Sequence, residues 1–360
     1  MKVVVAMSGG VDSSVAAALL KQEGYDVIGA TMQLRPSDEN NNGNGRQSSP
    51  GLDAVADARK VAEKLGIPHH VIDLRDAFAR TIIADFCREY SLGRTPNPCV
   101  RCNQLIKFGI LWEKARELGA DFLATGHYAR IEKDGTTGKN LLKKGKDPLK
   151  DQSYFLCRLT QEQLGFTLFP LGNLTKTGVR QIARELGLPV AARPESQEIC
   201  FIPGDDYAAF LQNYAPAAAS PGPILDSKGN VLGQHRGIMF YTIGQRKGLG
   251  IAAPQPLYVT AIEPERNAVI VGAKEQTYTD ELVADNFNWL SGSAPVYPIT
   301  VKARVRYRHP EAEAIVSLLD KTSIHVKFSA PQMAVTPGQT VVFYDGDTVI
   351  GGGTIIKQGR

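Results

Sequence analysis

The chain has 360 residues, of which 43% are hydrophobic and 22% charged, and its formal net charge is +4. This composition is ordinary for a soluble globular protein, and the length allows roughly two or three domains. The first apolar run ends at Met7, short of the roughly 7–15 apolar residues of a signal peptide, and no run approaches the roughly 20 of a membrane helix. We therefore expect a cytoplasmic protein without a membrane segment.

The chain contains few cysteines, and their number is odd. The five positions are Cys87, Cys99, Cys102, Cys157 and Cys200. In a cytoplasmic chain, such a sparse set does not indicate a framework of disulfides. Cys87 and Cys157 lie in helical or apolar stretches and are expected to pack in the core.

The first predicted element is a buried parallel strand over the apolar, β-branched residues 2–7. It is followed by SGGVDSS at residues 8–14, in which two glycines allow a sharp turn and a close approach to a ligand. A helix that begins near Ser13 would point its free N–H groups into this turn, an arrangement that attracts phosphate. The turn is not a Walker A loop, because no lysine precedes Ser13, and it does not match the G-x-G-x-x-G dinucleotide motif.

SGGVDSS after a first strand resembles the PP-loop of the ATP pyrophosphatase superfamily, whose members adenylate a substrate oxygen. On this interpretation, the hydroxyls of Ser8, Ser13 and Ser14 and several backbone N–H groups hold the pyrophosphate part of ATP. The carboxylate of Asp12 is a candidate ligand of Mg²⁺. The alternative is a glycine turn capped by serines that binds nothing.

Strands and helices alternate over the first 125 residues. The expected strands cover residues 2–7, 26–32, 69–74 and 122–125, and the expected helices cover residues 53–65, 76–90 and 103–118. This alternation predicts an α/β fold with a doubly wound parallel sheet and helices on both faces. Ligands of such sheets bind at the carboxyl ends of the strands, where the loop at 8–12, Met32 and Gly126 lie.

Two insertions interrupt this α/β unit. Residues 36–51 (PSDENNNGNGRQSSPG) contain no aliphatic or aromatic side chain and are expected to form a disordered loop, to which we assign no function. Residues 130–150 carry seven Lys or Arg against three Asp or Glu, a local net charge of +4. They fit either a solvated hairpin or a contact with a phosphate backbone.

The rest of the chain changes character twice. Residues 160–189 are expected to be helical, with a capping box formed by Thr160 and Gln163. Residues 204–280 combine short strands with many Gly and Pro, and residues 281–360 alternate like strands without helices, which predicts a small β-barrel. We therefore divide the chain into an α/β domain at 1–203, a central domain at 204–280 and a C-terminal barrel at 281–360.

One predicted strand, VKARVRYR at residues 301–308, carries a cation at every second position. Side chains alternate between the two faces of a strand, so these cations are expected on one face, about 6.7 Å apart. They are Lys302, Arg304, Arg306 and Arg308. The spacing is similar to that of successive phosphates and favours a nucleic-acid contact, with a solubilising edge strand as the alternative.

The pair Cys99-x-x-Cys102 follows two prolines, and a helix is expected to begin directly after it. A helix N-terminus and the nearby Arg101 and Lys107 would favour the thiolate of Cys102. One C-x-x-C pair is short of the four ligands of a usual structural zinc site. With the distant Cys200, the pair fits either an iron–sulfur cluster that leaves one iron open or a sulfur-transfer pair of nucleophile and carrier.

Strings along nearly the whole chain, in order, are similar to those of the bacterial tRNA-specific 2-thiouridylases. They are SGGVDSS, TPNPCVRCNQLIKFG, ATGHYAR, KDQSYFL, PESQEICFI and YTIGQRKGLG. The resemblance implies an α/β catalytic domain, a central tRNA-binding or linker domain and a C-terminal β-barrel. It also implies an ATP-dependent sulfurtransferase that thiolates the wobble uridine of the tRNAs for Lys, Glu and Gln.

The resemblance also implies roles for individual residues. Cys102 takes the role of the nucleophile, and Cys200 that of the persulfide carrier. The positions that match ATP-binding residues are Ala6, Met7, Ser8, Gly9, Gly10, Val11, Asp12, Ser13, Met32 and Gly126. Those beside the target base are Asn97, Pro98 and Cys99, and those that match tRNA contacts are His127, Lys150, Asp151, Gln152, Arg306, Tyr307 and Gln339.

In the implied reaction, ATP adenylates the C2 oxygen of a uridine that has left its base stack, because that oxygen is otherwise a poor leaving group. The sulfur comes from a persulfide on Cys200, which a cysteine desulfurase or a sulfur-relay protein loads, and ATP and Mg²⁺ are the expected cofactors. Cys102 then attacks the persulfide, with release of free hydrosulfide as the variant. We expect a monomer that binds tRNA.

One position departs from the family pattern, because many members carry Asp where this chain has Cys99. A thiol is a weaker acid than a carboxylic acid, which weakens the case for proton transfer by this residue and keeps the cluster alternative open. Two other classes compete with the thiolation hypothesis. A PP-loop amidotransferase or ligase would need neither Cys102 nor Cys200, and a non-catalytic tRNA-binding protein would not need the loop.

Overall fold

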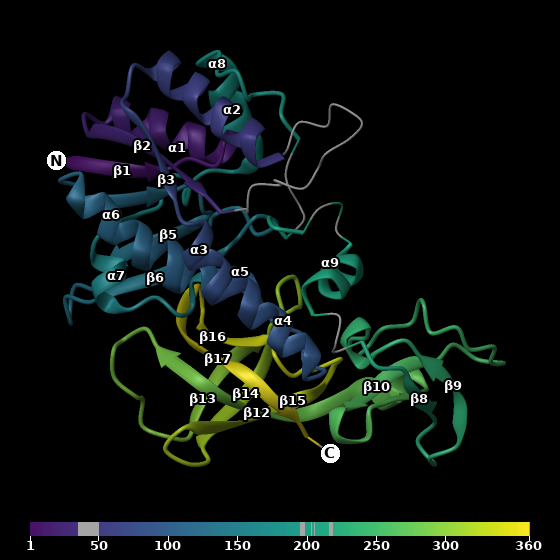
Figure 1. The fold of residues 1–360 in the computed structure, drawn as a ribbon. Coiled ribbons are helices and arrows are strands. Elements are labelled where there is room, and N and C mark those ends of the chain that lie inside the picture. The colour runs from purple at the N-terminus through teal and green to yellow at the C-terminus, as the bar shows by residue number, and fades with distance from the viewer. Residues whose placement is uncertain (35–49, 195–198, 203, 205, 216–218, 360) are drawn as a thin grey trace, which may run out of the picture.

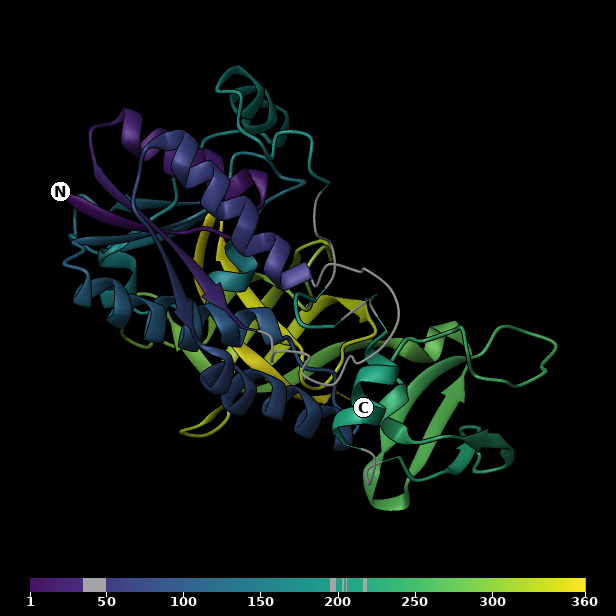
Figure 2. The same ribbon diagram turned by 45° about the horizontal axis from the view of Figure 1, so that its top comes forward.

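The computed structural model describes residues 1–34, 50–194, 199–202, 204, 206–215 and 219–359. Three regions follow one another along the chain: an α/β region, a small central β region and a C-terminal β-barrel (Figure 1, Figure 2). The insertion predicted at 36–51 lies, up to residue 49, outside the described residues.

A parallel five-stranded sheet forms the core of the α/β region, with the strand order β3-β2-β1-β4-β7. Its strands are β1 (Lys2–Ala6), β2 (Asp26–Gln33), β3 (His69–Asp73), β4 (Phe122–Thr125) and β7 (Thr167–Leu168). Val3 and Val5 pack in one hydrophobic core and Val4 in another, as expected for a strand that is buried on both faces. The predicted doubly wound parallel sheet is confirmed, with the short β7 as an additional strand.

Helices cover both faces of this sheet. One face carries α1 (Val11–Gln22), α2 (Pro50–Leu65) and α8 (Lys176–Glu185). The other carries α3 (Arg75–Phe78), α4 (Ala84–Ser91), α5 (Pro98–Arg101), α6 (Leu111–Glu117) and α7 (Gln161–Gly165). The predicted capping box of Thr160 and Gln163 is present at the start of α7. Within the described ranges, no helix has both the length and the apolar character needed to cross a membrane.

Two helical runs contain π-helical segments. Residues Ala79–Ile83 connect α3 to α4, and Cys102–Ile110 connect α5 to α6. The second run begins at Pro98 and has Asn97 as its N-cap, so the prediction that a helix begins only after Cys102 is wrong. The reason is that proline suits the first helical position, where no intrahelical N–H bond is lost. π-helical turns are frequent at functional sites, and this one begins at a cysteine.

The central region is a four-stranded sheet with the order β10-β11-β8-β9. Its strands are β8 (Gly222–Leu225), β9 (Val231–His235), β10 (Tyr258–Glu263) and β11 (Ala268–Gly272), and α9 (Tyr207–Tyr214) precedes them. Phe201 and Phe210 pack edge-on against Phe86 of α4, with ring centroids 5.3 and 6.1 Å away. One hydrophobic core therefore continues from the α/β region into the central region.

The C-terminal region is the predicted small barrel, closed by six antiparallel strands. They are β12 (Tyr278–Trp289), β13 (Ile299–Arg304), β14 (Ala312–Leu318), β15 (Ser323–Met333), β16 (Thr340–Asp345) and β17 (Thr348–Gln358). Pairing of β12 with both β15 and β17 closes the ring. Closure leaves these strands without an open edge and encloses a separate apolar core.

The basic insertion of the α/β region extends this barrel sheet. It forms a hairpin of β5 (Ala129–Lys133) and β6 (Asn140–Lys144), and β6 pairs with β17. Arg130 forms ion pairs with Glu132 and Asp347, at 2.6 and 2.5 Å, and Lys144 pairs with Glu311 at 2.7 Å. These cations join the hairpin to the barrel, which favours a docked hairpin over a phosphate contact for both of them.

The prediction that four cations share one strand face is wrong. β13 ends at Arg304, whose guanidinium pairs with Glu311 at 2.7 Å. Arg306 donates to two backbone carbonyl oxygens at 3.0 and 3.4 Å, and Arg308 lies in a turn with a φ of +65°. The predicted alternation extends beyond the end of the strand. Of the four cationic side chains, those of Arg304 and Arg306 already bind acceptors within the protein.

Candidate active site

The glycine-rich turn lies between β1 and α1, at the carboxyl edge of the parallel sheet (Figure 1). Gly9 has a φ of +70°, and a Cβ at this position would collide with the backbone of Ala54 at the start of α2. Only glycine allows this conformation and this approach. The turn is therefore fixed by its own backbone geometry and by the neighbouring helix.

Serine hydroxyl groups stabilise the turn through hydrogen bonds within it. The Ser13 hydroxyl accepts the N–H of Ser8 at 3.1 Å and lies 3.2 Å from the carbonyl oxygen of Gly10, to which it donates. The Ser14 hydroxyl donates to the same carbonyl at 2.8 Å. α1 begins at Val11, slightly earlier than predicted, so the N–H groups of its first turn lie within the predicted loop.

The other predicted ATP-binding residues lie at the same edge. Ala6 is the last residue of β1, Met32 lies near the end of β2, and Gly126 follows β4. A Cβ on Gly126 would lie 2.7 Å from the backbone N of Ser13, so the end of β4 touches the turn directly. The structure thus brings together residues that are more than 100 positions apart in sequence.

Asp12 makes contacts that the sequence did not predict. Its carboxylate accepts hydrogen bonds from Nζ of Lys176, at 2.7 and 2.8 Å, and from the hydroxyl of Tyr128 at 2.8 Å. Lys176 is only 8% exposed, and it opens α8, where a cation opposes the helix dipole. A lysine in that unfavourable position is the one sequence signal that could have identified Lys176 as a functional candidate.

The arrangement does not supply a protein-held Mg²⁺ site. Both oxygens of Asp12 face the ammonium group of Lys176, and the described residues contain no group of three or more His, Cys, Asp or Glu that could hold a metal ion. Hard cations such as Mg²⁺ prefer several oxygen ligands.

Arg193 is a second residue that the sequence did not single out. Its Nη1 donates to the carbonyl oxygen of Gly9 at 3.0 Å and forms an ion pair with Asp57 of α2. The guanidinium thus fixes the glycine turn against a helix. No local pattern in the sequence connects these three residues.

The turn is connected to the cysteines through Gly126 and His127. His127 is 9% exposed, and its Nδ1 lies 2.7 Å from the hydroxyl of Thr125. Burial and the charge of Lys107 lower the pKa of His127 well below its usual value. Lys107 also lowers the thiol pKa values of Cys99 and Cys102, so its charge acts on the histidine and on both cysteines.

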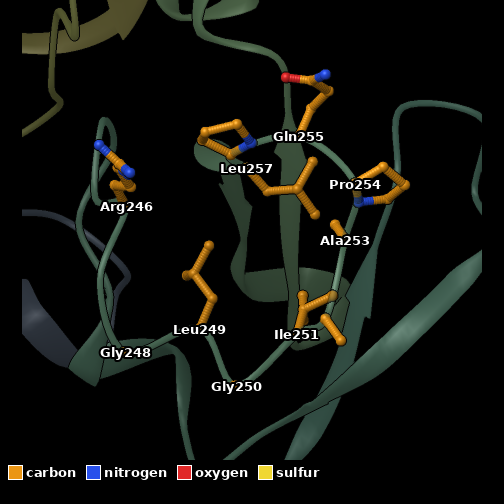
Figure 3. A pocket seen from close by; sticks show the side chains of 11 residues that line it. Arg246, Gly248, Leu249, Gly250, Ile251, Ala253, Pro254, Gln255 and Leu257 are labelled. Atoms are coloured by element: carbon orange, nitrogen blue, oxygen red, sulfur yellow. The ribbon is translucent and has the colours of Figure 1, made fainter.

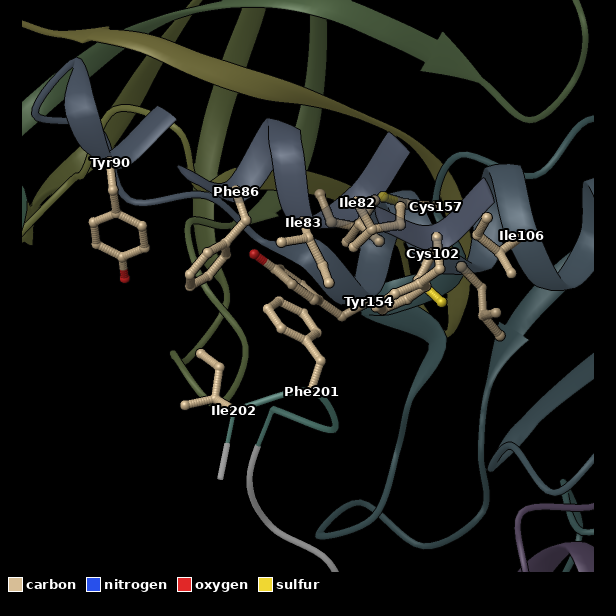
Figure 4. Close-up of a cluster of buried hydrophobic side chains, with 14 of the residues drawn as sticks. Ile82, Ile83, Phe86, Tyr90, Cys102, Ile106, Tyr154, Cys157, Phe201 and Ile202 are labelled. Atoms are coloured by element: carbon tan, nitrogen blue, oxygen red, sulfur yellow. The ribbon is translucent and has the colours of Figure 1, made fainter. Parts of the chain in front are cut away.

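All five cysteines lie in the described residues and are present as thiols. Cys102 is buried in the same hydrophobic cluster as Ile106 and Tyr154 (Figure 4). Cys99 and Cys200 are exposed. Cys200 directly precedes Phe201, whose ring is anchored against Phe86. The residue that follows Cys200 is therefore held in place by packing against the aromatic core.

The expectation that the Cys102 thiolate is favoured is wrong for this state. The pKa of Cys102 is raised to about 12, chiefly by burial; Lys107 opposes the shift, and the neighbouring thiols of Cys200 and Cys99 add to it. The Cys99 residue as a whole is exposed, but desolvation of its thiol raises the pKa of Cys99 to about 11. Cys102 lies one turn inside its helix, and Arg101 pairs with Asp85 at 3.0 Å, so of the three expected activating features only Lys107 acts on the thiol.

Two of the predicted tRNA contacts are internal. The Asp151 carboxylate accepts the N–H groups of Gly145 and Ser153, both at 3.1 Å. The side-chain oxygen of Gln152 accepts the N–H of Tyr128 at 3.1 Å. Lys150, beside them, is half-buried. Asp151 and Gln152 thus shape the chain next to Tyr128, which contacts Asp12.

The remaining predicted tRNA contacts come from the barrel. Tyr307 packs against Phe155, with ring centroids 4.4 Å apart, directly after Arg306. The side-chain Nε2 of Gln339 donates to the carbonyl oxygens of Thr95 and Pro96, at 2.8 and 3.4 Å. The barrel therefore reaches the loop that precedes Asn97, Pro98 and Cys99.

A separate surface hollow of about 670 Å³ lies in the central region (Figure 3). It is lined by Arg246 and by residues 248–257, which belong to a single loop. None of the predicted site residues lines it. The candidate active site is therefore the region between the glycine turn and the cysteines.

The fold and the glycine turn define a PP-loop domain of the HUP type, joined to two β domains. Family models match in the same order: "tRNA methyl transferase HUP domain" over residues 1–204, "tRNA methyl transferase PRC-barrel domain" over 208–273 and "Aminomethyltransferase beta-barrel domain" over 279–355. Among solved structures, a 4-thiouridine synthetase–RNA complex with bound ATP covers 60% of this chain and 51% of its own at 18% identity. Its TM-score of 0.34 is too low to support a functional argument.

The curated relatives are much closer. The "tRNA-specific 2-thiouridylase MnmA" of Heliobacterium modesticaldum is 53% identical over 357 residues, which cover 99% of this chain and 92% of that protein. The "tRNA-specific 2-thiouridylase MnmA 1" of Caldanaerobacter subterraneus subsp. tengcongensis is 53% identical over 359 residues, which cover 100% and 99%. The chain belongs to the family of tRNA-specific 2-thiouridylases.

Proposed function

We propose that this chain uses ATP to activate the C2 oxygen of the wobble uridine in the tRNAs for Lys, Glu and Gln, and replaces it with sulfur from a cysteine persulfide. Membership of the family makes the chain an enzyme that transfers sulfur to tRNA. One observation carries the proposal further. Gly126 touches the glycine turn, and the ring of the adjacent His127 lies 6.3 Å from that of Phe108, which belongs to the same π-helical segment as Cys102. A nucleotide on the turn and a base beside Cys99 would then share one site.

In the activation step, the uridine C2 oxygen attacks the α-phosphorus of ATP, and pyrophosphate leaves. On this proposal, the free N–H groups at the start of α1 and the hydroxyls of Ser8 and Ser13, which lie 3.3 Å apart, hold the phosphates. Lys176 is the nearby cation that can balance the charge of the departing pyrophosphate. ATP enters as MgATP, so the Mg²⁺ is carried by the substrate.

In the sulfur-transfer step, the terminal sulfur of a Cys200 persulfide attacks C2, and AMP leaves with the former C2 oxygen. Cys102 then attacks the Cys200 sulfur, which leaves the terminal sulfur on the uridine and forms a Cys102–Cys200 disulfide. In the variant, Cys102 attacks first and releases hydrosulfide, which attacks C2. A thiol reductant restores the cysteines in both cases, and a cysteine desulfurase or sulfur-relay protein reloads Cys200.

The state described here is a resting state on this proposal. Burial raises the pKa of Cys102 to about 12, so the thiol is protonated near neutral pH. The thiolate is the nucleophile in such exchanges. Binding of tRNA therefore has to bring a proton acceptor or Lys107 closer to Cys102 before sulfur is transferred.

An iron–sulfur cluster on Cys99, Cys102 and Cys200 does not fit the described arrangement. The three thiols influence one another electrostatically, yet they do not form a group that is placed to hold a metal ion among the described residues. No step of the proposed reaction passes through a cluster.

The test of the persulfide route uses single cysteine variants that a desulfurase has loaded with sulfur. We expect Cys200→Ser to carry no transferable sulfur, and Cys102→Ser to carry it but to thiolate tRNA poorly or not at all. Cys99→Ser is the matched control in the same C-x-x-C pair and should retain substantial activity. Mass analysis that maps the sulfur adduct to Cys102 in Cys200→Ser would reverse the two roles.

A further inference from the structure

The loop that leads into the cysteines is held by the C-terminal barrel. Residues 92–97 join α4 to α5 and contain no helix or strand. The N–H of Thr95 donates to the carbonyl oxygen of Pro337 at 2.8 Å, and the carbonyl oxygen of Thr95 accepts from Nε2 of Gln339 at 2.8 Å. Both backbone groups of Thr95 are thus satisfied by the turn at 337–339, which directly precedes β16.

Gly338 contacts the backbone of the same loop. It has a φ of +91°, and a Cβ at this position would lie 2.9 Å from the N, C and O atoms of Thr95. A side chain at 338 would therefore have to displace either the turn or the loop. Gly346, in the next turn of the barrel, also has a positive φ, of +58°, but no atom lies within 4 Å of its Cβ position. The two glycines share the backbone constraint and differ in the contact with the loop.

The central region contacts the loop as well. The Thr95 hydroxyl donates to the hydroxyl of Thr242 at 3.1 Å. A Cβ on Gly93 would lie 2.6 Å from Cγ2 of Ile262 in β10. All three regions of the chain therefore meet on the four residues 93–96, just before the cysteine pair.

The loop passes directly into the residues that carry the cysteines. Asn97 is the N-cap of α5 and accepts the N–H of Val100 at 3.4 Å. Prolines at 96 and 98 restrict φ on both sides of Asn97. A shift at Thr95 is therefore transmitted to Cys99 in α5, because the intervening backbone has little freedom to absorb it.

We propose that the turn at 337–339 is a positioning element of the active site, and that Gly338 and Gln339 set the placement of the Cys99–Cys102 pair. In this role the barrel is part of the catalytic geometry. The side-chain amide of Gln339 binds the loop at Thr95 in the absence of RNA. This positioning role is therefore distinct from the tRNA contact that the resemblance implies for Gln339. The effect on the rate of thiolation rests on the proposed function, whereas the placement of the cysteine pair by the turn does not.

The first test compares Gly338→Ala with the matched control Gly346→Ala in the full-length protein. We expect Gly338→Ala to lower kcat for tRNA thiolation by at least about tenfold, since small misplacements of reacting groups are costly, while the KM for tRNA stays at the control value. Alkylation of Cys99 by iodoacetamide, measured without tRNA or ATP, should be faster in Gly338→Ala than in the control. Equal kcat and equal alkylation in the two variants would overturn the proposal.

Gln339→Met decides the question if Gly338→Ala does not fold. It removes the amide donor and keeps the length of the side chain. Faster alkylation of Cys99 in the absence of tRNA supports the positioning role. Unchanged alkylation with weaker tRNA binding makes Gln339 a tRNA contact only and overturns the proposal. Altered alkylation in a protein whose wild type does not thiolate tRNA would support positioning and contradict the proposed function.

Discussion

At the residue scale, Asp12 and Lys176 bind each other beneath the glycine turn, with Tyr128 as a third partner. The lysine side chain is 10% exposed and that of Asp12 is 32% exposed, so the pair is shielded on the lysine side. An ATP phosphate at the turn would offer Lys176 a second anion. In this structure the carboxylate that the sequence suggested as a Mg²⁺ ligand thus forms an ion pair with a lysine.

Replacement of Lys176 by Met tests this role. Loss of the cation leaves the Asp12 carboxylate without its ion pair beside the phosphates, so we expect ATP- and tRNA-dependent pyrophosphate release to fall by about 10²-fold or more, with unchanged tRNA affinity. Lys144→Met, which breaks an ion pair with Glu311 at the barrel, is the matched control. Equal pyrophosphate release in both variants would show that Lys176 has only a structural role.

The raised thiol pKa values predict a distinct pH dependence. With the pKa of Cys102 at about 12 and that of Cys99 at about 11, the thiolate fraction of each rises about tenfold per pH unit throughout the range below its pKa. Alkylation of either residue in the free protein should therefore increase steadily from pH 7 to about pH 9.5 without a plateau. A plateau near pH 8, read by peptide mass analysis, would mean that Cys102 is already activated in the free enzyme.

At the element scale, periodicity and turn residues predicted most of the α/β region. The strand at 122–125 matches β4, and the helix expected at 53–65 is α2 from Pro50 onward. Two boundaries differ from the prediction for different reasons. The helix that carries the cysteines begins already at Pro98, where proline suits the first helical position and Asn97 is the N-cap, whereas β13 ends at Arg304 although the alternation of cations continues beyond it.

Arg306 is the side chain for which this difference matters most. The cationic-strand hypothesis makes it a phosphate contact, whereas in the structure its guanidinium donates to the carbonyl oxygens of Met333 and Ala334. We expect Arg306→Ala to lower the free energy of unfolding by about 2 kcal/mol, because hydrogen bonds from a charged donor are lost. Lys302→Ala, at an exposed position of β13 shortly before Arg306, should change it by less than about 0.5 kcal/mol. Equal stability of the two variants in thermal unfolding would contradict this assignment.

At the scale of the whole molecule, the sequence predicted the three regions in order and the glycine turn at the carboxyl edge of the sheet. It did not predict the contacts between regions: Lys176 on Asp12, Gln339 on the loop before Asn97, and the hairpin β5–β6 on β17. Each joins residues 164 or more positions apart. Local periodicity carries no information about such pairs, so the candidate site was predicted as a set of motifs and not as an assembled geometry.

The central claim is that the C2 oxygen of the target uridine leaves the tRNA on AMP. The most direct measurement is a single turnover of the persulfide-loaded enzyme with ATP and a tRNA that carries ¹⁸O at C2 of the wobble uridine, followed by mass analysis of the nucleotide products. We expect ¹⁸O in the phosphate of AMP, unlabelled pyrophosphate and one 2-thiouridine for each labelled AMP. Label in water with unlabelled AMP, or thiolation without formation of AMP, would contradict it.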